Sequence, residues 1–497
     1  MMMRTSTLET TNHEKLFTRI ESMLDEKRLQ IVRLDTEEKM LLANGEFTPL
    51  EASDKALRTL FYKESSLFLS GKQIQTLKEY LEIHPVTDTT VYQTANRIYN
   101  DGNLYAYELE RETGKCIVMT ETEICIGKIS HVFFRHSSDY KNQIEPEWKV
   151  DVQDIFPLVH KHFNLKNEKQ EKLLILYLVT AFWGLRIAHP LLILTGEKGS
   201  SKSTTMRKLE RLIDPKKSDL CGLPKGSDGL ELRLSNTYFV TLDNLSNISR
   251  NVSDTIARAV TGGSVTKRAL YHNTKEIVMD IKALVAMNGV SLIAKESDLL
   301  DRSLILELDR ISSKEIKGEE ELWEAFEKDR AKILGCVFLI LSEALFDQEE
   351  TTVKEKIRLA DFHIACIKVG RVLHMTESEV SSLLWENQKN VNRQSIDEDI
   401  VACCLLELMS HEKEYVNSVT GLLCDLSRIA YQNGIVSSTL PKTPNHLSIA
   451  VKRRLRATYN PEIQHHISCA SSKVLSKKCT IRNNEKVCDS CESENRQ

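Results

Sequence analysis

The chain has 497 residues, of which 41% are hydrophobic, and a formal net charge of −4 at pH 7. The length allows about three domains, and the composition is that of a soluble globular protein. The first residues lack the apolar run of a secretory signal, and the longest apolar stretch, residues 173–184, is too short to cross a bilayer. Twelve cysteines without a compact framework are typical of reduced thiols, so we expect a cytoplasmic protein with no membrane partner.

The first 150 residues predict two regions without recognisable site chemistry. Residues 1–90 are charged and carry helical periodicity, as at Leu16, Ile20 and Met23, which predicts a helical region of unknown role. Residues 91–150 contain strand-like runs at 104–109 and 116–119 that are separated by a turn-forming segment, which predicts a hairpin. We therefore expect a small β-rich module before the next domain.

Residues 151–315 alternate helix and strand patterns, which predicts a parallel three-layer α/β fold. Within it, residues 190–213 predict a strand, a glycine-containing loop and a helix whose amides and dipole face phosphates. In such a loop Lys202 reaches the β- and γ-phosphates and Ser203 ligates Mg²⁺, although Ser201 stands where the strict pattern has glycine. An ordinary loop is the alternative. The sequence predicts that ATP binds at Gly196, Glu197, Lys198, Gly199, Ser200, Ser201, Lys202, Ser203 and Thr204.

A second buried strand, residues 237–244, ends in Asp243, as expected of a carboxylate that orients Mg²⁺ in an ATPase. A capping aspartate after a buried strand is the alternative. The next residue is Asn244, where many ATPases have a glutamate that polarises the attacking water. Hydrolysis could therefore be slow, or the base could come from elsewhere.

Two further strands end or begin with candidate catalytic residues. The strand at 283–287 is followed by Asn288, which could contact the γ-phosphate or position water, although Asn-Gly is also a common turn. Arg302 precedes another strand, as expected of an arginine finger that acts on a neighbouring subunit's γ-phosphate. A surface arginine paired with an acid is the alternative. The predicted catalytic set is Lys202, Asp243, Asn244, Asn288 and Arg302.

Residues 261–271 and the return run 276–281 predict a β-hairpin between the second and third strands. The order of loop, Asp-Asn strand, hairpin, Asn-ending strand and Asp-Arg resembles superfamily 3 helicases. The nearest likeness is to the AAA+ modules of phage, plasmid and poxvirus-type primase-helicases, over residues 188–310 and less closely to about 482. The resemblance implies an AAA+ core in a homo-oligomeric ring, often hexameric, whose hairpins project into a channel that holds DNA. It also implies DNA contacts at His272 and Lys275, near the hairpin tip, and contacts with DNA or the adjoining subunit at Lys267 and Arg268.

After a helical region at 316–411, residues 412–484 predict a basic module. Between 435 and 484 the chain has nine Lys or Arg and one acidic residue. A helix is predicted at 416–433, and a second one has Thr443 as its N-cap and Pro444 as its first residue. With a hairpin from 464–469 and 477–482, this order resembles a winged helix. A solvated charged face is the alternative, but the charge excess favours DNA contacts at Lys452, Arg453, Arg454, Arg456, Lys473, Lys477 and Lys478.

The tail, residues 485–497, is expected to be flexible, and its Cys488 and Cys491 are weak evidence for zinc, so no metal beyond Mg²⁺ is predicted. The sequence thus predicts an ATP-dependent helicase or replication ATPase of a phage, plasmid or integrated element. It would act on single-stranded or forked DNA, with a separate primase as a possible partner. The alternatives are a non-translocating DNA-bound ATPase, such as an initiator, helicase loader or defence switch, and a DNA-binding regulator with a decayed ATP site.

Overall fold

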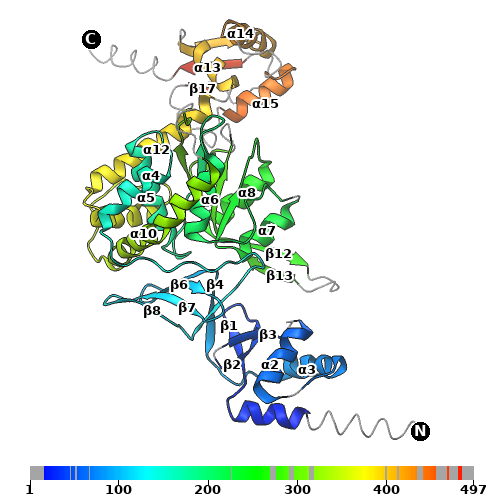
Figure 1. Ribbon diagram of the computed structural model, residues 1–497. Coiled ribbons are helices and arrows are strands. Elements are labelled where there is room, and N and C mark those ends of the chain that lie inside the picture. Colours follow the sequence, from blue (N-terminus) through cyan, green and yellow to red (C-terminus); the bar gives the residue numbers. More distant parts are fainter. Residues whose placement is uncertain are drawn as a thin grey trace. The chain divides into compact units, whose positions relative to one another are not determined.

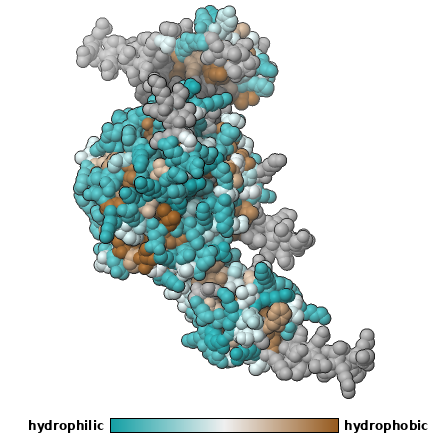
Figure 2. Space-filling view, in the orientation of Figure 1, coloured by the Kyte–Doolittle hydropathy of each residue, from teal (hydrophilic) through white to brown (hydrophobic). Residues whose placement is uncertain are grey.

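A computed structural model of the chain (Figure 1) divides it into two compact units, Met1–Ser137 and Ser138–Gln497. The visible face of the molecule is mainly hydrophilic, with small hydrophobic groups between (Figure 2), because most large apolar side chains are buried. The structure describes residues 16–44, 46–50, 53–66, 68–224, 226–268, 276–289, 296–312, 318–397, 400–410, 414–433, 440–454, 467–469 and 479–483.

The first unit contains a five-stranded sheet in the order β3-β2-β1-β4-β9. Strands β1 to β3 are antiparallel, whereas β4 is parallel to β1 and β9 is parallel to β4. A helical segment at 16–25 and helices α2 (Asp54–Ser65) and α3 (Gly71–Ile83) contribute side chains to one core with this sheet. The strands are β1 (Gln30–Leu34), β2 (Lys39–Ala43), β3 (Glu46–Pro49), β4 (Val91–Ala95) and β9 (Val132–Phe134).

The prediction of a helical region over residues 1–90 is therefore incomplete, since β1, β2 and β3 lie within it. Runs of four or five residues are too short for periodicity to separate strand from helix. The boundary predicted at residue 90 also differs from the structure, because β4 pairs with β1 in one sheet.

The predicted β-rich module contains an antiparallel sheet in the order β5-β6-β7-β8. The hairpin expected from the sequence is confirmed, since Tyr105 pairs with Met119 and Tyr107 pairs with Ile117. Its strands are β5 (Ile98–Asn100), β6 (Tyr105–Glu110), β7 (Lys115–Met119) and β8 (Ile124–Gly127).

The second unit contains a four-stranded parallel sheet in the order β11-β14-β10-β15. Nearly every residue of these strands is buried, which explains why they appear in the sequence as continuous apolar runs. The mixed α/β character predicted for this region is confirmed. The strands are β10 (Leu191–Thr195), β11 (Phe239–Leu242), β14 (Leu284–Asn288) and β15 (Ser303–Glu307).

Helices pack against this sheet from several chain segments. Helix α6 (Lys202–Ile213) contacts β11 and β14, and α8 (Arg250–Thr261) contacts β14. Helix α5 (Glu168–Ala181) and α12 (Glu377–Asp397) contact β15. The other helices of this part are η1 (Val152–Asp154), α4 (Ile155–His162), α7 (Ser227–Asn236) and α9 (Ser297–Leu300).

The hairpin predicted between the second and third strands is present (Figure 1). Strand β12 (Ser264–Arg268) pairs antiparallel with β13 (Glu276–Asp280), and the Ser264 hydroxyl donates to Asp280 at 2.7 Å.

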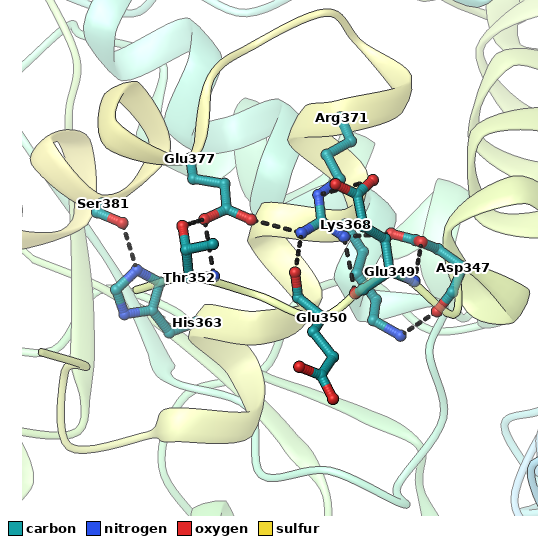
Figure 3. A network of polar contacts seen from close by, with 9 residues as sticks. All are labelled: Asp347, Glu349, Glu350, Thr352, His363, Lys368, Arg371, Glu377 and Ser381. Carbon is teal, nitrogen blue, oxygen red and sulfur yellow. Dashed lines mark hydrogen bonds and ion pairs between the residues drawn. The ribbon is translucent and has the colours of Figure 1, made fainter. Parts of the chain in front are cut away.

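The predicted helical region is also confirmed, with α10 (Glu319–Phe346), α11 (Ala360–Val372), α12 and α13 (Ile400–Ser410). Arg371 on α11 holds the segment after α10 in place (Figure 3). Its guanidinium donates to Asp347 at 2.8 Å, to the backbone carbonyl of Glu350 at 2.9 Å, and to Glu377 on α12. These contacts join two helices and a connecting segment through one side chain.

The C-terminal part of the second unit has a small antiparallel sheet in the order β16-β18-β17. Helices α13, α14 (Val419–Gln432) and α15 (Pro444–Arg454) share a core with Ile481 of β18. The expected hairpin is confirmed as β17 (Ile467–Cys469) and β18 (Cys479–Asn483).

The start of the helix predicted over 416–433 is wrong. Residues Glu414–Asn417 form β16 instead, and α14 begins after Ser418, whose hydroxyl accepts from the Gly421 N–H at 3.0 Å. A serine N-cap satisfies an otherwise unpaired amide, which sets the start of the helix at this position. The predicted Thr443 cap is confirmed, because the His446 N–H donates to its hydroxyl at 3.3 Å. Within the described ranges, we find no helix with the length and apolar character needed to span a membrane.

Candidate active site

The loop between β10 and α6 has the backbone geometry that its glycines allow. Gly196 has φ 150° and Gly199 has φ 84°. A Cβ atom at position 196 would lie 2.6 Å from the carbonyl oxygen of Leu308. Only glycine fits there, because the loop passes directly against the chain that follows β15. Ser201, in the position where the strict motif has glycine, adopts φ 64° and ψ 25°, a left-handed conformation.

Lys202 is the first residue of α6 and lies over the loop. Its ammonium donates to the carbonyl oxygens of Gly196 and Glu197, both at 2.7 Å, and to the Ser200 hydroxyl at 3.3 Å. Partial burial lowers the pKa of this ammonium. The N-terminal amides of α6 start at the same place, so the loop carries both a cation and the positive end of a helix.

Three predicted residues meet at the carboxyl edge of the sheet. The Ser203 hydroxyl donates to Asp243 Oδ1 at 2.8 Å, and Asn288 Nδ2 donates to the same oxygen at 2.6 Å. The side-chain oxygen of Asn288 accepts from the Asn244 N–H at 2.6 Å. Asn288 is only 2% exposed, so its amide is fixed between Asp243 and Asn244.

A buried contact farther along α6 fixes this helix against β11. Glu210 on α6 accepts from the Thr241 hydroxyl at 2.6 Å and from Lys216 at 3.0 Å. Glu210 is 6% exposed, and such a buried carboxylate is stable only with partners of this kind. Because Thr241 lies two residues before Asp243, the contact places Ser203 and Asp243 opposite one another.

The oxygens of Ser203 and Asp243 form a donor set that suits Mg²⁺, which binds hard oxygen ligands and keeps most of its coordination for phosphates and water. The described ranges contain no group of three or more His, Cys, Asp or Glu side chains arranged to hold a metal ion. A Mg²⁺ ion here would take its further ligands from phosphate and water. Asn244 is exposed and adopts φ 55°, a conformation that asparagine tolerates.

Arg302 lies at the opposite edge of the sheet. It precedes β15, whose first residue, Ser303, pairs with Leu191 at the start of β10. The loop follows the other end of β10, so a five-residue strand of roughly 16 Å separates the two positions. One chain therefore does not bring Arg302 to Lys202.

Arg302 belongs to an ion-pair cluster at this amino edge. Its guanidinium donates to the Asp298 carboxylate, which also accepts from Arg358 at 2.6 Å. Arg358 contacts Asp301 at 3.4 Å, and burial raises the pKa of the Asp301 carboxyl above its ordinary value. The side chain of Arg302 is 17% exposed.

The predicted DNA contacts are described only in part. Lys267 and Arg268 lie on β12, where they pair with Ile277 and Glu276 of β13. The last turn of α15 contains Lys452, Arg453 and Arg454. The other predicted contacts and the tail cysteines lie outside the described residues, namely His272, Lys275, Arg456, Lys473, Lys477, Lys478, Cys488 and Cys491.

Arg310 also lies beside the loop, although it is not among the residues that the sequence predicted for the site. Its guanidinium is 3.7 Å from the Glu197 carboxylate. Because β10 and β15 are parallel neighbours, the segments that follow them leave the sheet side by side. The sequence could indicate Arg310 only if this pairing of strands were already known.

A family model described as the actinomycete integrative conjugative element replication protein matches residues 157–382. This range contains the loop, Asp243, Asn288 and Arg302. Over these residues the chain is similar to that family. The match supports the predicted link to the replication of a mobile element.

Solved structures of the NrS-1 C-terminal region are also similar to the chain. The A form apo structure has a TM-score of 0.42 and 13% identity, covering 93% of this chain and 98% of that one. Another apo structure of this region has a TM-score of 0.41 and 12% identity, covering 93% and 97%. No curated protein matches the chain.

Proposed function

We propose that this protein is a DNA-dependent ATPase of the superfamily 3 AAA+ type that serves replication of a mobile element. It hydrolyses ATP between subunits of a ring and translocates on DNA. The observation that carries the proposal is the convergence of Ser203 and Asn288 on one oxygen of Asp243, next to a glycine loop that begins a helix. The family match to a replication protein supports the biological setting.

In this proposal each residue has one task. The loop amides and Lys202 bind the phosphate chain, while Ser203 and Asp243 hold Mg²⁺. Bound ATP and Mg²⁺ supply the phosphoanhydride bond and the divalent charge that offsets the phosphates. Asn288 positions the attacking water near Asp243, and its fixed amide suits that task because it needs no reorganisation.

The remaining parts supply the ring and the DNA contacts. Arg302 acts on the site of a neighbouring copy, since its own loop lies at the other edge of the sheet. The β12–β13 hairpin contacts DNA in the channel. The order α13, β16, α14, α15, β17, β18 supports a winged helix whose basic residues bind phosphates.

A second candidate function is a non-translocating DNA-bound ATPase, in which ATP sets the assembly state. Asn244 favours it, because an amide cannot accept a proton from water as a glutamate can.

Two assays test the proposal. One measures ATP hydrolysis with and without single-stranded DNA, and the other measures displacement of a labelled strand from a forked duplex. We expect turnover that DNA stimulates, with displacement. Turnover without displacement would favour the second candidate, and absence of ATP binding would contradict both.

A further inference from the structure

The chain that follows β15 runs alongside the loop between β10 and α6. Thr195 and Glu307 are paired at the ends of the two strands, and the Leu308 N–H donates to the Thr195 carbonyl at 2.9 Å. Further on, the Ile311 N–H donates to the Gly199 carbonyl at 3.3 Å. Two backbone bonds therefore hold residues 308–311 against the loop, with Arg310 between them.

Arg310 projects over this loop. Its guanidinium lies 3.7 Å from the Glu197 carboxylate, and the two side chains are 73% and 74% exposed. An exposed ion pair of this kind contributes little to stability, so Arg310 can change partner at small cost. The neighbouring acid Glu307 is bound by Lys166 at 2.6 Å.

Glu197 contacts both cations near the loop, Lys202 and Arg310. Its backbone carbonyl accepts from Lys202 at 2.7 Å, and its carboxylate faces Arg310. A phosphate chain that enters the loop to reach Lys202 would pass within reach of the guanidinium. Arginine suits such a ligand, because its planar fork can donate two parallel hydrogen bonds to phosphate oxygens.

We propose that Arg310 is a ligand for the phosphate chain of the nucleotide bound by its own chain, and that Glu197 holds it over the loop until phosphate replaces the carboxylate. This inference rests on the proposed ATP site. It assigns an arginine to the carboxyl edge of the sheet in the same subunit, in addition to Arg302 from a neighbouring one.

The test measures ATP, ADP and adenosine affinities by isothermal titration calorimetry for the full chain, Arg310→Ala and Arg310→Lys. For Arg310→Ala, loss of a charge-assisted contact raises the Kd for ATP about tenfold or more. ADP affinity should fall, adenosine affinity should not, and Arg310→Lys should retain part of the affinity. The matched control is Arg33→Ala, which removes an exposed arginine paired with Glu37 at 3.3 Å in the other unit.

Two outcomes would overturn the inference. One is an ATP Kd for Arg310→Ala equal to that of Arg33→Ala. The other is a loss of adenosine affinity in Arg310→Ala as large as its loss of ATP affinity, which would mean that Arg310 contacts the nucleoside and not the phosphates. Melting temperatures check that the variants fold. We expect them to be unchanged, because the Arg310 side chain is exposed.

The Glu197→Gln variant distinguishes two roles for Arg310, as a ligand of the phosphate chain or as a support for the loop structure through its pair with Glu197. If the carboxylate holds Arg310 until phosphate replaces it, its removal frees the guanidinium and ATP affinity improves by about twofold. An unchanged affinity would mean that Glu197 does not hold Arg310. A loss as large as that of Arg310→Ala would mean that the pair is needed for loop structure, against the proposal. Lys202→Ala distinguishes the two failures. Should it abolish ATP binding while Arg310→Ala does not weaken it, the inference alone is wrong. If the unaltered chain does not bind ATP, the proposed function and the inference are both wrong.

Discussion

At the carboxyl edge of the parallel sheet, Ser203 and Asn288 both donate to Asp243, whereas at the amino edge Arg302 and Arg358 both donate to Asp298. The donors at the carboxyl edge are neutral and leave the negative charge of Asp243 available to a cation. At the amino edge, two guanidinium groups face two carboxylates, because Asp301 also contacts Arg358. Neutral donors therefore surround the aspartate at the carboxyl edge, whereas positively charged donors surround the aspartate at the amino edge.

This difference indicates how the edges could work together. A bound phosphate chain with its cation needs the carboxyl edge, and a developing negative charge in the transition state needs arginine. A strand of roughly 16 Å separates the two edges within one chain. If both edges serve one reaction, they must come from different copies of the protein, and each prediction below tests that arrangement or the construction of one edge.

The largest effect is expected for Arg302→Ala. An arginine finger contributes about a thousandfold or more to turnover, so kcat should fall by that order while the Kd for ATP stays within about twofold. Steady-state ATPase assays and titration calorimetry measure both quantities. Mixing this variant with Lys202→Ala protein should restore some turnover, because a mixed interface can contain an intact loop and an intact arginine. Failure to restore turnover would indicate that Arg302 does not act across subunits.

Arg358→Ala is the matched control, because it removes the other arginine from Asp298. It should lower kcat much less than Arg302→Ala. Equal losses would mean that the ion-pair cluster is structural, and Arg302→Lys would then show whether charge alone is sufficient.

The next effect is expected at the carboxyl edge. Lys202→Ala removes a charged donor from the loop, so the Kd for ATP should rise roughly 100-fold. DNA affinity, measured by fluorescence anisotropy, should change little, because the C-terminal basic residues are remote in sequence and have their own core. Lys217→Ala, an exposed lysine beyond the far end of α6, is the control and should leave both affinities unchanged. Equal loss of ATP and DNA binding by Lys202→Ala would contradict the separation of the two functions.

A smaller effect is expected for Asn288→Ala, which removes the amide that joins Asp243 to the Asn244 N–H. Leaving these groups without their partner should lower the free energy of unfolding by about 1–3 kcal/mol. Asn387 provides a matched comparison, since it is 4% exposed and bonds both backbone groups of Ile305, at 3.1 and 2.6 Å. Urea denaturation should show similar losses for the two alanine variants, but kcat should fall only for Asn288→Ala. An equal loss of kcat in both would assign Asn288 a structural role alone.

Much of the carboxyl edge could be predicted from the sequence because its signals are local. Buried apolar runs end in Thr195, Leu242 and Asn288, and parallel strands place their carboxyl ends at one edge. The three predicted hairpins also follow from short-range pattern and turn residues.

The parts that were missed depend on contacts between distant residues or on very short elements. Arg358 reaches Asp298 from 60 positions away, and Arg310 reaches the loop only because β15 lies next to β10. Strand β16 has four residues, and a helix follows it directly, so helical periodicity covered it. Neither kind of feature has a signature within a short sequence window.

The smallest effect concerns Ser201, where the loop departs from the strict motif. Its left-handed conformation, with φ 64°, costs a serine about 1 kcal/mol relative to glycine. Ser201→Gly should therefore raise the free energy of unfolding by up to about 1 kcal/mol, less the greater chain entropy of glycine in the unfolded state. Ser66→Gly is the comparison, since Ser66 ends α2 in the other unit with φ 58°. A gain in urea denaturation at Ser66 but not at Ser201 would mean that the Ser201 hydroxyl makes a compensating contact. If ATP affinity also fell, that contact would belong to the carboxyl edge, and the serine would be a functional departure from the motif rather than a tolerated one.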